Sequence, residues 1–129
     1  MENINTKDTI LLVDDEQVVL DVGTLMIKKI GYKVLQAANV AEATKIFKEN
    51  VDDICLVVLD MQLPDENGST TCERLKGIKP DTKVLHTSGL DRTPDGVSFA
   101  CGCNGFLLKP FRLEEFSNKL KDLLENPSE

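Results

Sequence analysis

The sequence predicts an α/β fold, a doubly wound five-stranded parallel sheet with helices on both faces. The first observation behind this prediction is that five short apolar runs alternate along the chain with segments of helical periodicity. The second is that several of these runs end abruptly in polar residues. Parallel sheets bind their ligands at the carboxyl ends of the strands, so the polar ends also indicate where a functional site lies.

Length and composition fit one globular domain. The chain has 129 residues, of which 41% are hydrophobic and 29% charged. A domain of this size buries enough surface for a core without disulfides or metals. We expect the domain to span residues 9–125, between an N-terminal tail at 1–8 and a C-terminal tail or truncated linker at 126–129.

Charge and hydropathy exclude several classes of partner. The net charge of −7 argues against direct binding of nucleic acid, which needs a basic surface. The sequence contains no apolar stretch near the roughly 20 residues needed to span a bilayer. The polar N-terminus lacks the apolar core of a secretory signal. We therefore expect a cytoplasmic protein with no membrane contact, no direct nucleic-acid contact and no DNA-binding output domain.

The first apolar run, 9–13, predicts a strand that ends in Asp14 and Asp15. The apolar residues that follow recur at helical spacing, and Gly31 ends the predicted helix. These residues are Val18, Val19, Val22, Leu25, Met26 and Ile30. The run 33–37 is more polar, so we expect a strand near an edge of the sheet.

The central strand of the predicted sheet is 56–60, preceded by Ile54 and Cys55. Its unbroken apolar run is typical of a strand buried on both faces, and it ends in Asp60. The helix before it begins after Asn39, a plausible N-cap. One apolar face of that helix is formed by Val40, Ala43, Ile46 and Phe47.

The second half of the chain repeats the alternation. Pro64 and the pair Asn67-Gly68 predict a loop over 61–68, followed by a helix over 69–77 with Cys72 and Leu75 inward. A strand is expected at 83–87, a weakly apolar helix within 90–102, and a fifth strand at 105–108. The last helix has the strongest apolar face, formed by Leu113, Phe116, Leu120, Leu123 and Leu124.

The four cysteines and the one histidine do not form a clear metal-binding or redox site. Cys55 falls on the central strand and Cys72 on a core-facing helical position, where free cysteine acts as a small hydrophobe. Cys101 and Cys103 have no second Cys or His pair to complete a metal site. We expect free thiols, and we expect His86 to pack or cap within its strand.

The polar strand ends form the candidate site. We expect the spatial order 2-1-3-4-5, with strands numbered along the chain, and a crevice between the first and third strands. Asp14 and Asp15 would lie on one side of that crevice and Asp60 on the other. Crowded carboxylates need a cation, and Mg²⁺ suits oxygen ligands of this kind. Thr87 and Lys109, at the ends of the fourth and fifth strands, would supply a hydroxyl and a fixed positive charge.

This set of groups suits phosphoryl transfer to a carboxylate. The Asp60 carboxylate would be the nucleophile, while the cation and Lys109 neutralise charge on the transferring group. Thr87 could donate a hydrogen bond to a phosphoryl oxygen once the phosphate is formed.

The motifs resemble those of response-regulator receiver domains, the phosphoacceptor part of bacterial two-component signalling. The resemblance covers about residues 8–125 and lies in four stretches at matching spacing. These are 10–16, 58–64 with Asn67-Gly68, 87–89 and 105–111. It implies a flavodoxin-like fold and a phosphorelay function in which Asp60 accepts a phosphoryl group. The donor would be a sensor histidine kinase or a histidine phosphotransfer domain.

The resemblance also assigns roles to metal ligands and to the lysine-proline pair 109–110. It implies that Asp15 and Asp60 bind Mg²⁺ directly, together with the backbone carbonyl of Gln62, and that Asp14 binds it through water. Lys109 would pair with Asp60 or its phosphate, and the bond to Pro110 would be cis.

The resemblance also implies a conformational switch on phosphorylation. Thr87 would shift toward the phosphate and Phe106 would rotate inward, remodelling the face of the fourth helix, fifth strand and fifth helix. A downstream effector would read that face, and a homodimer could form through it. Such a chain is a signalling phosphoacceptor and not an enzyme, although it assists its own phosphorylation and dephosphorylation.

Two departures from the family pattern bear on these implications. Arg112 stands where many members have a helix-capping Ser or Thr, and residues 91–100 fit the pattern poorly. One alternative is a degenerate receiver that acts as a constitutive binding module, but the intact acid triad, Thr87 and Lys109 count against it. A haloacid dehalogenase-type hydrolase is disfavoured because Gln62 replaces the second acid. A flavodoxin-like nucleotide binder is disfavoured because the chain lacks a phosphate-binding loop.

Overall fold

The fold is a five-stranded parallel sheet with helices on both faces, as the sequence predicts. The computed structural model describes residues 8–60, 68–88, 105–108 and 112–125. Within them the strand order is β2-β1-β3-β4-β5. The elements are β1 Thr9–Val13, α1 Gln17–Ile30, β2 Lys33–Ala37, α2 Val40–Glu49, β3 Ile54–Asp60, α3 Gly68–Ile78, β4 Val84–Ser88, β5 Gly105–Leu108 and α5 Leu113–Glu125. The predicted fourth helix lies outside the described residues.

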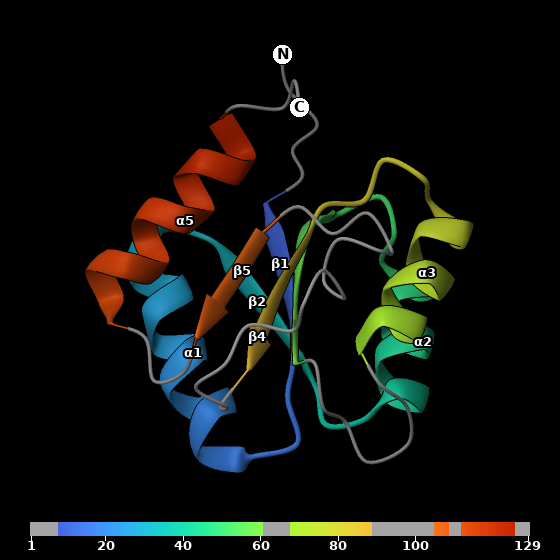
Figure 1. Cartoon of the computed structure of the whole chain (residues 1–129), viewed down its shortest axis with the longest axis horizontal. Helices are drawn as coiled ribbons and strands as arrows, with labels where there is room; N and C mark the ends of the chain where they lie inside the picture. The colour runs from blue at the N-terminus through green and yellow to red at the C-terminus, as the bar shows by residue number, and fades with distance from the viewer. Residues whose placement is uncertain (1–7, 61–67, 89–104, 109–111, 126–129) are drawn as a thin grey trace.

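Two apolar cores lie between the sheet and its helices, one on each face of the sheet. Figure 1 shows α1 and α5 on one face of the sheet and α2 and α3 on the other. Because side chains alternate along a strand, Leu11 and Leu59 pack toward α2 and α3, while Leu12 and Val58 pack toward α1 and α5. Strands β1 and β3 are buried on both faces, which explains why their sequences are nearly continuous apolar runs.

The apolar residues of α1 lie on more than one side of the helix, and only some of them, such as Met26 and Ile30, pack against the core. The helix buries Leu20, Gly23 and Ile27. The side chains of Val18, Val22 and Leu25 are instead 65%, 44% and 69% exposed. Gly23 explains the orientation, because a Cβ there would lie 2.8 Å from Leu12 Cδ2. The glycine thus permits the close approach of α1 to β1.

Local signals set the helix ends. The Asn39 side chain accepts a hydrogen bond of 2.9 Å from the Glu42 backbone N–H, which confirms the predicted N-cap of α2. Gly31 ends α1 with a φ of 115°, a conformation that glycine adopts without strain. Arg112 provides no hydroxyl cap before α5, but its backbone N–H donates to the Glu115 carboxylate at 3.2 Å. The Glu115 side chain, in the first turn of α5, therefore caps the start of its own helix.

The bounds of some elements differ slightly from the predicted ones. The structure starts β4 at Val84 and ends it at Ser88, one residue later at each end than predicted. It extends α3 by one residue at each end, to Gly68–Ile78.

None of the helices in the described part of the chain is long and apolar enough to cross a membrane.

Candidate functional site

Asp60 is the last residue of β3, the central strand. Its side chain is only 4% exposed, and the four residues before it are fully or almost fully buried. The parallel register of β3 and β4 places Thr87 directly beside Asp60, and Thr87 is also buried. A rigid strand therefore presents the Asp60 carboxylate next to a threonine at the carboxyl end of the sheet.

Asp14 follows β1 and is fixed by two hydrogen bonds. Its backbone N–H donates to the Ala37 carbonyl at 3.1 Å, which extends the β1–β2 ladder by one residue. Its side-chain Oδ1 accepts a bond of 2.9 Å from the backbone N–H of Glu16. Asp14 is buried, whereas the next residue, Asp15, is exposed.

The three carboxylates converge at one point. One oxygen from each of Asp14, Asp15 and Asp60 lies within 4.8 Å of the other two. Three like charges at this range repel one another, so the arrangement favours a bound cation. Mg²⁺ prefers carboxylate oxygens and keeps several waters, and a site that mixes buried and exposed acids suits both requirements. The donor set therefore fits the magnesium ion that the sequence predicts.

Only part of the predicted constellation lies within the described residues. Asp14, Asp15 and Asp60 meet, and Thr87 lies beside Asp60. The backbone of Phe106 lies in β5, in register with His86, and the role of its side chain stays a prediction. The remaining predicted site residues lie outside the described residues: Gln62, Lys109 and Pro110. His86 itself is completely buried in β4, in agreement with a packing role.

The Glu16 backbone N–H is a site component that the sequence reading did not identify. It holds the Asp14 carboxylate at the start of α1. A signal for it exists, because Asp often hydrogen-bonds the backbone two residues further on. In this chain that residue directly precedes the first helical position, Gln17.

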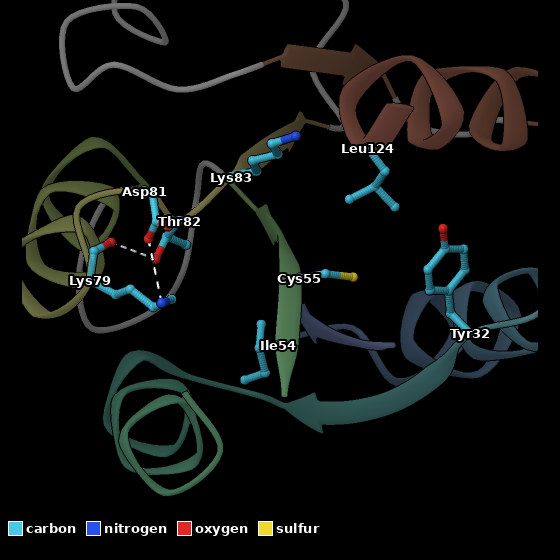
Figure 2. Close-up of a pocket in the computed structure, with 8 residues that line it drawn as sticks. All are labelled: Tyr32, Ile54, Cys55, Lys79, Asp81, Thr82, Lys83 and Leu124. Atoms are coloured by element: carbon cyan, nitrogen blue, oxygen red, sulfur yellow. Dashed lines mark hydrogen bonds and ion pairs between the residues drawn. The ribbon is translucent and has the colours of Figure 1, made fainter. Parts of the chain in front are cut away.

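A separate pocket lies at the opposite end of β3. It has a volume of about 310 Å³, and Figure 2 shows the Cys55 sulfur pointing toward the space between Tyr32 and Leu124. Cys55 precedes Asp60 by five positions, a separation of about 17 Å along a strand. At the pocket's rim, Lys83 Nζ donates to the Leu123 carbonyl at 2.6 Å. This pocket is therefore distinct from the acidic cluster.

Comparisons with known proteins agree on one family. The sequence profile of the response regulator receiver domain matches residues 10–121. The chain is 33% identical over 118 residues to the sensor kinase CckA of Brucella abortus, and this match covers 91% of the chain. It is 30% identical over 118 residues, 89% of the chain, to the DNA-binding dual master transcriptional regulator RpaA of Synechocystis.

Solved structures show the same fold. A response regulator receiver domain protein from Clostridium thermocellum superposes with a TM-score of 0.85 at 26% identity, covering 92% of this chain and 94% of that one. The response regulator TrrA of Thermotoga maritima, solved in complex with Mg²⁺-BeF, gives a TM-score of 0.81 at 27% identity and covers 91% and 99%. The chain spans only 12% of the Brucella kinase and 48% of the Synechocystis regulator.

Proposed function

The chain belongs to the response regulator receiver domains, and we propose that it accepts a phosphoryl group on Asp60 from a phosphohistidine of a partner protein. The observation that carries this proposal is the convergence of the Asp14, Asp15 and Asp60 oxygens within 4.8 Å of one another. The position of Thr87 beside Asp60 supports it further. In an ordinary solvated turn the acids would stay exposed, because burying a charged group without a partner is costly. Here two of the three acids, Asp14 and Asp60, are buried.

The chemistry rests on a few groups of this chain. An Asp60 carboxylate oxygen attacks phosphorus and forms an acyl phosphate, the P–N bond of the phosphohistidine breaks, and its electron pair returns to the imidazole. Asp14, Asp15 and Asp60 would hold Mg²⁺, which would supply positive charge against the phosphoryl oxygens. Thr87 then donates its hydroxyl hydrogen to one of those oxygens. The β3 strand keeps the carboxylate oriented throughout.

Phosphorylation by a small-molecule donor tests the proposal without knowledge of the partner. We expect the wild-type chain, incubated with acetyl phosphate and Mg²⁺, to gain one phosphate by intact-mass spectrometry. Omission of Mg²⁺ should prevent the gain. A chain that no phosphodonor modifies would contradict the proposal and favour the constitutive binding module.

Replacing Asp15 by asparagine should weaken Mg²⁺ binding at least tenfold while leaving the fold intact. Asp15 is exposed but contributes one of the three clustered oxygens, so its loss removes a ligand and no core contact. Calorimetric titration with Mg²⁺ measures the affinity. The matched control is Asp52→Asn, the same change at an exposed acid outside the cluster, which should bind Mg²⁺ nearly as wild type. Equal losses in both variants would show that general negative charge, and not the cluster, binds the ion.

Further roles rest on the same proposal. We infer that Lys109 would pair with the Asp60 phosphate, and that Thr87 and Phe106 would relay phosphorylation to an effector-binding face. The backbone carbonyl of Gln62 and a cis bond at Pro110 would complete the site. Cytoplasmic location, homodimerisation and the division into a 9–125 domain with two tails stay predictions.

A further inference from the structure

The pocket at the amino ends of β3 and β4 combines apolar walls with a half-buried cation. Figure 2 shows the Tyr32 ring, the Cys55 sulfur and Leu124 around one space, with Lys83 at its edge. The volume of about 310 Å³ lies at the lower end of the range for small-molecule sites, which is roughly 300–1,000 Å³. Such sites typically have apolar walls and a few polar groups. The pocket is therefore large enough for a small organic ligand.

The Lys83 ammonium group is held in place at the edge of this pocket. Lys83 directly precedes β4, and its Nζ donates to the Leu123 carbonyl, in the last turn of α5, at 2.6 Å. Carbonyls at the end of a helix carry partial negative charge, so this contact is favourable. It uses one of the three N–H donors of the ammonium group. The cation is therefore fixed in position and keeps donors for a further acceptor.

The other charged groups that line the pocket compensate each other. Lys79 Nζ and the Asp81 carboxylate form an ion pair at 3.5 Å. Lys83 has no carboxylate partner among the residues that the structure describes. A half-buried charge without a counter-ion favours the binding of an opposite charge. One uncompensated cation matches the single charge of a carboxylate better than the roughly two charges of a phosphate monoester at neutral pH.

We propose that this pocket binds a small aromatic monocarboxylate. The carboxylate accepts hydrogen bonds from Lys83 Nζ, and the aromatic ring packs between Tyr32 and Leu124, over the Cys55 thiol. A ring suits this space because aromatic pairs gain energy in offset or edge-to-face arrangements beyond the apolar area they bury. The inference does not depend on the proposed phosphorylation of Asp60, because it concerns the opposite end of β3.

A matched pair of ligands tests the pocket in the wild-type chain. Phenylacetate carries one ring and one carboxylate, and phenylacetamide has nearly the same shape without the charge. In an NMR titration of the isotopically labelled chain, phenylacetate should shift the backbone N–H signals of Tyr32, Cys55, Lys83 and Leu124, with a Kd of about 1 mM or lower. Phenylacetamide should bind at least tenfold more weakly, because it brings no negative charge to Lys83.

Two lysine variants separate the anchoring cation from general positive charge. Lys83→Met keeps most of the apolar stem and removes the ammonium group, so it should weaken phenylacetate binding at least tenfold and leave phenylacetamide binding within twofold. The control Lys79→Met removes the same charge from a lysine of the same pocket that is already paired with Asp81. It should bind phenylacetate within twofold of wild type. Tyr32→Ala should weaken both ligands, because it removes the ring against which they pack.

Other outcomes would overturn the proposal. Absence of NMR shifts with either ligand at millimolar concentration, or shifts confined to other parts of the chain, would show that this pocket is not the site. Equal affinities of the acid and the amide in the wild-type chain would remove the role of the Lys83 charge. Equal losses in the two lysine variants would assign binding to general charge. Loss of phenylacetamide binding in Lys83→Met would show that this lysine only shapes the pocket.

Discussion

Replacing Asp60 by asparagine is expected to abolish phosphorylation of the chain by acetyl phosphate. The amide preserves the shape of the side chain but supplies no carboxylate oxygen to form the acyl phosphate. The variant should remain folded, because it removes one of three negative charges that crowd within 4.8 Å. Intact-mass spectrometry over time gives the rate, and thermal unfolding without Mg²⁺ should show an unchanged or raised Tm.

The control for Asp60→Asn is a carboxylate at the other end of the sheet. Asp81 is exposed between α3 and β4, where it pairs with Lys79 at 3.5 Å. Asp81→Asn should be phosphorylated at the wild-type rate. If Asp60→Asn still gained phosphate at that rate, the acceptor would have to be another residue.

Replacing Phe116 by alanine should lower the free energy of unfolding by about 3–5 kcal/mol. Phe116 is completely buried where α5 packs with β1 and β3, so the change leaves a cavity in that core. A domain of this size has a total stability of about 5–15 kcal/mol, so a large part of it would be lost. Urea denaturation of the two proteins measures the difference.

Val18→Ala is the matched control for this prediction. It also removes apolar atoms, but from the exposed side of α1, and should change the free energy of unfolding by about 0.5 kcal/mol or less. A loss as large as that of Phe116→Ala would mean that Val18 is part of the core, and the orientation of α1 would be wrong.

Strand positions and the acidic cluster follow from the sequence because each has a single physical cause. The central run 56–59 is apolar without interruption because both faces of its strand are buried. Parallel strands end at one edge of the sheet, so acids after the first and third strands had to meet there. The structure places Asp14, Asp15 and Asp60 together accordingly.

The face that α1 buries could not be predicted from periodicity. Apolar residues occur on both sides of this helix, so Val18, Val22 and Leu25 fit helical spacing as well as Leu20 and Ile27 do. Contact with the sheet decides between the two sides, and it requires a residue without a Cβ at Gly23. A glycine three residues after Leu20 and four before Ile27 was the available signal.

The two hydrogen bonds that hold Asp14 in place also depend on the tertiary structure. The Asp14 backbone N–H bonds to Ala37 only because β2 lies beside β1, and its carboxylate bonds to Glu16 only because the helix starts at Gln17. Neither partner follows from the identity of the residues alone. The sequence therefore predicts which acids form the site but not what orients them.

The most direct test of the central claim is to locate the phosphoryl group. Sodium borohydride reduces an aspartyl phosphate to homoserine, which marks the modified residue permanently for peptide mass spectrometry. After treatment with acetyl phosphate and Mg²⁺, we expect homoserine at position 60 and at no other aspartate. Homoserine at Asp14 or Asp15, or no homoserine at all, would contradict the assignment of Asp60 as the phosphoacceptor.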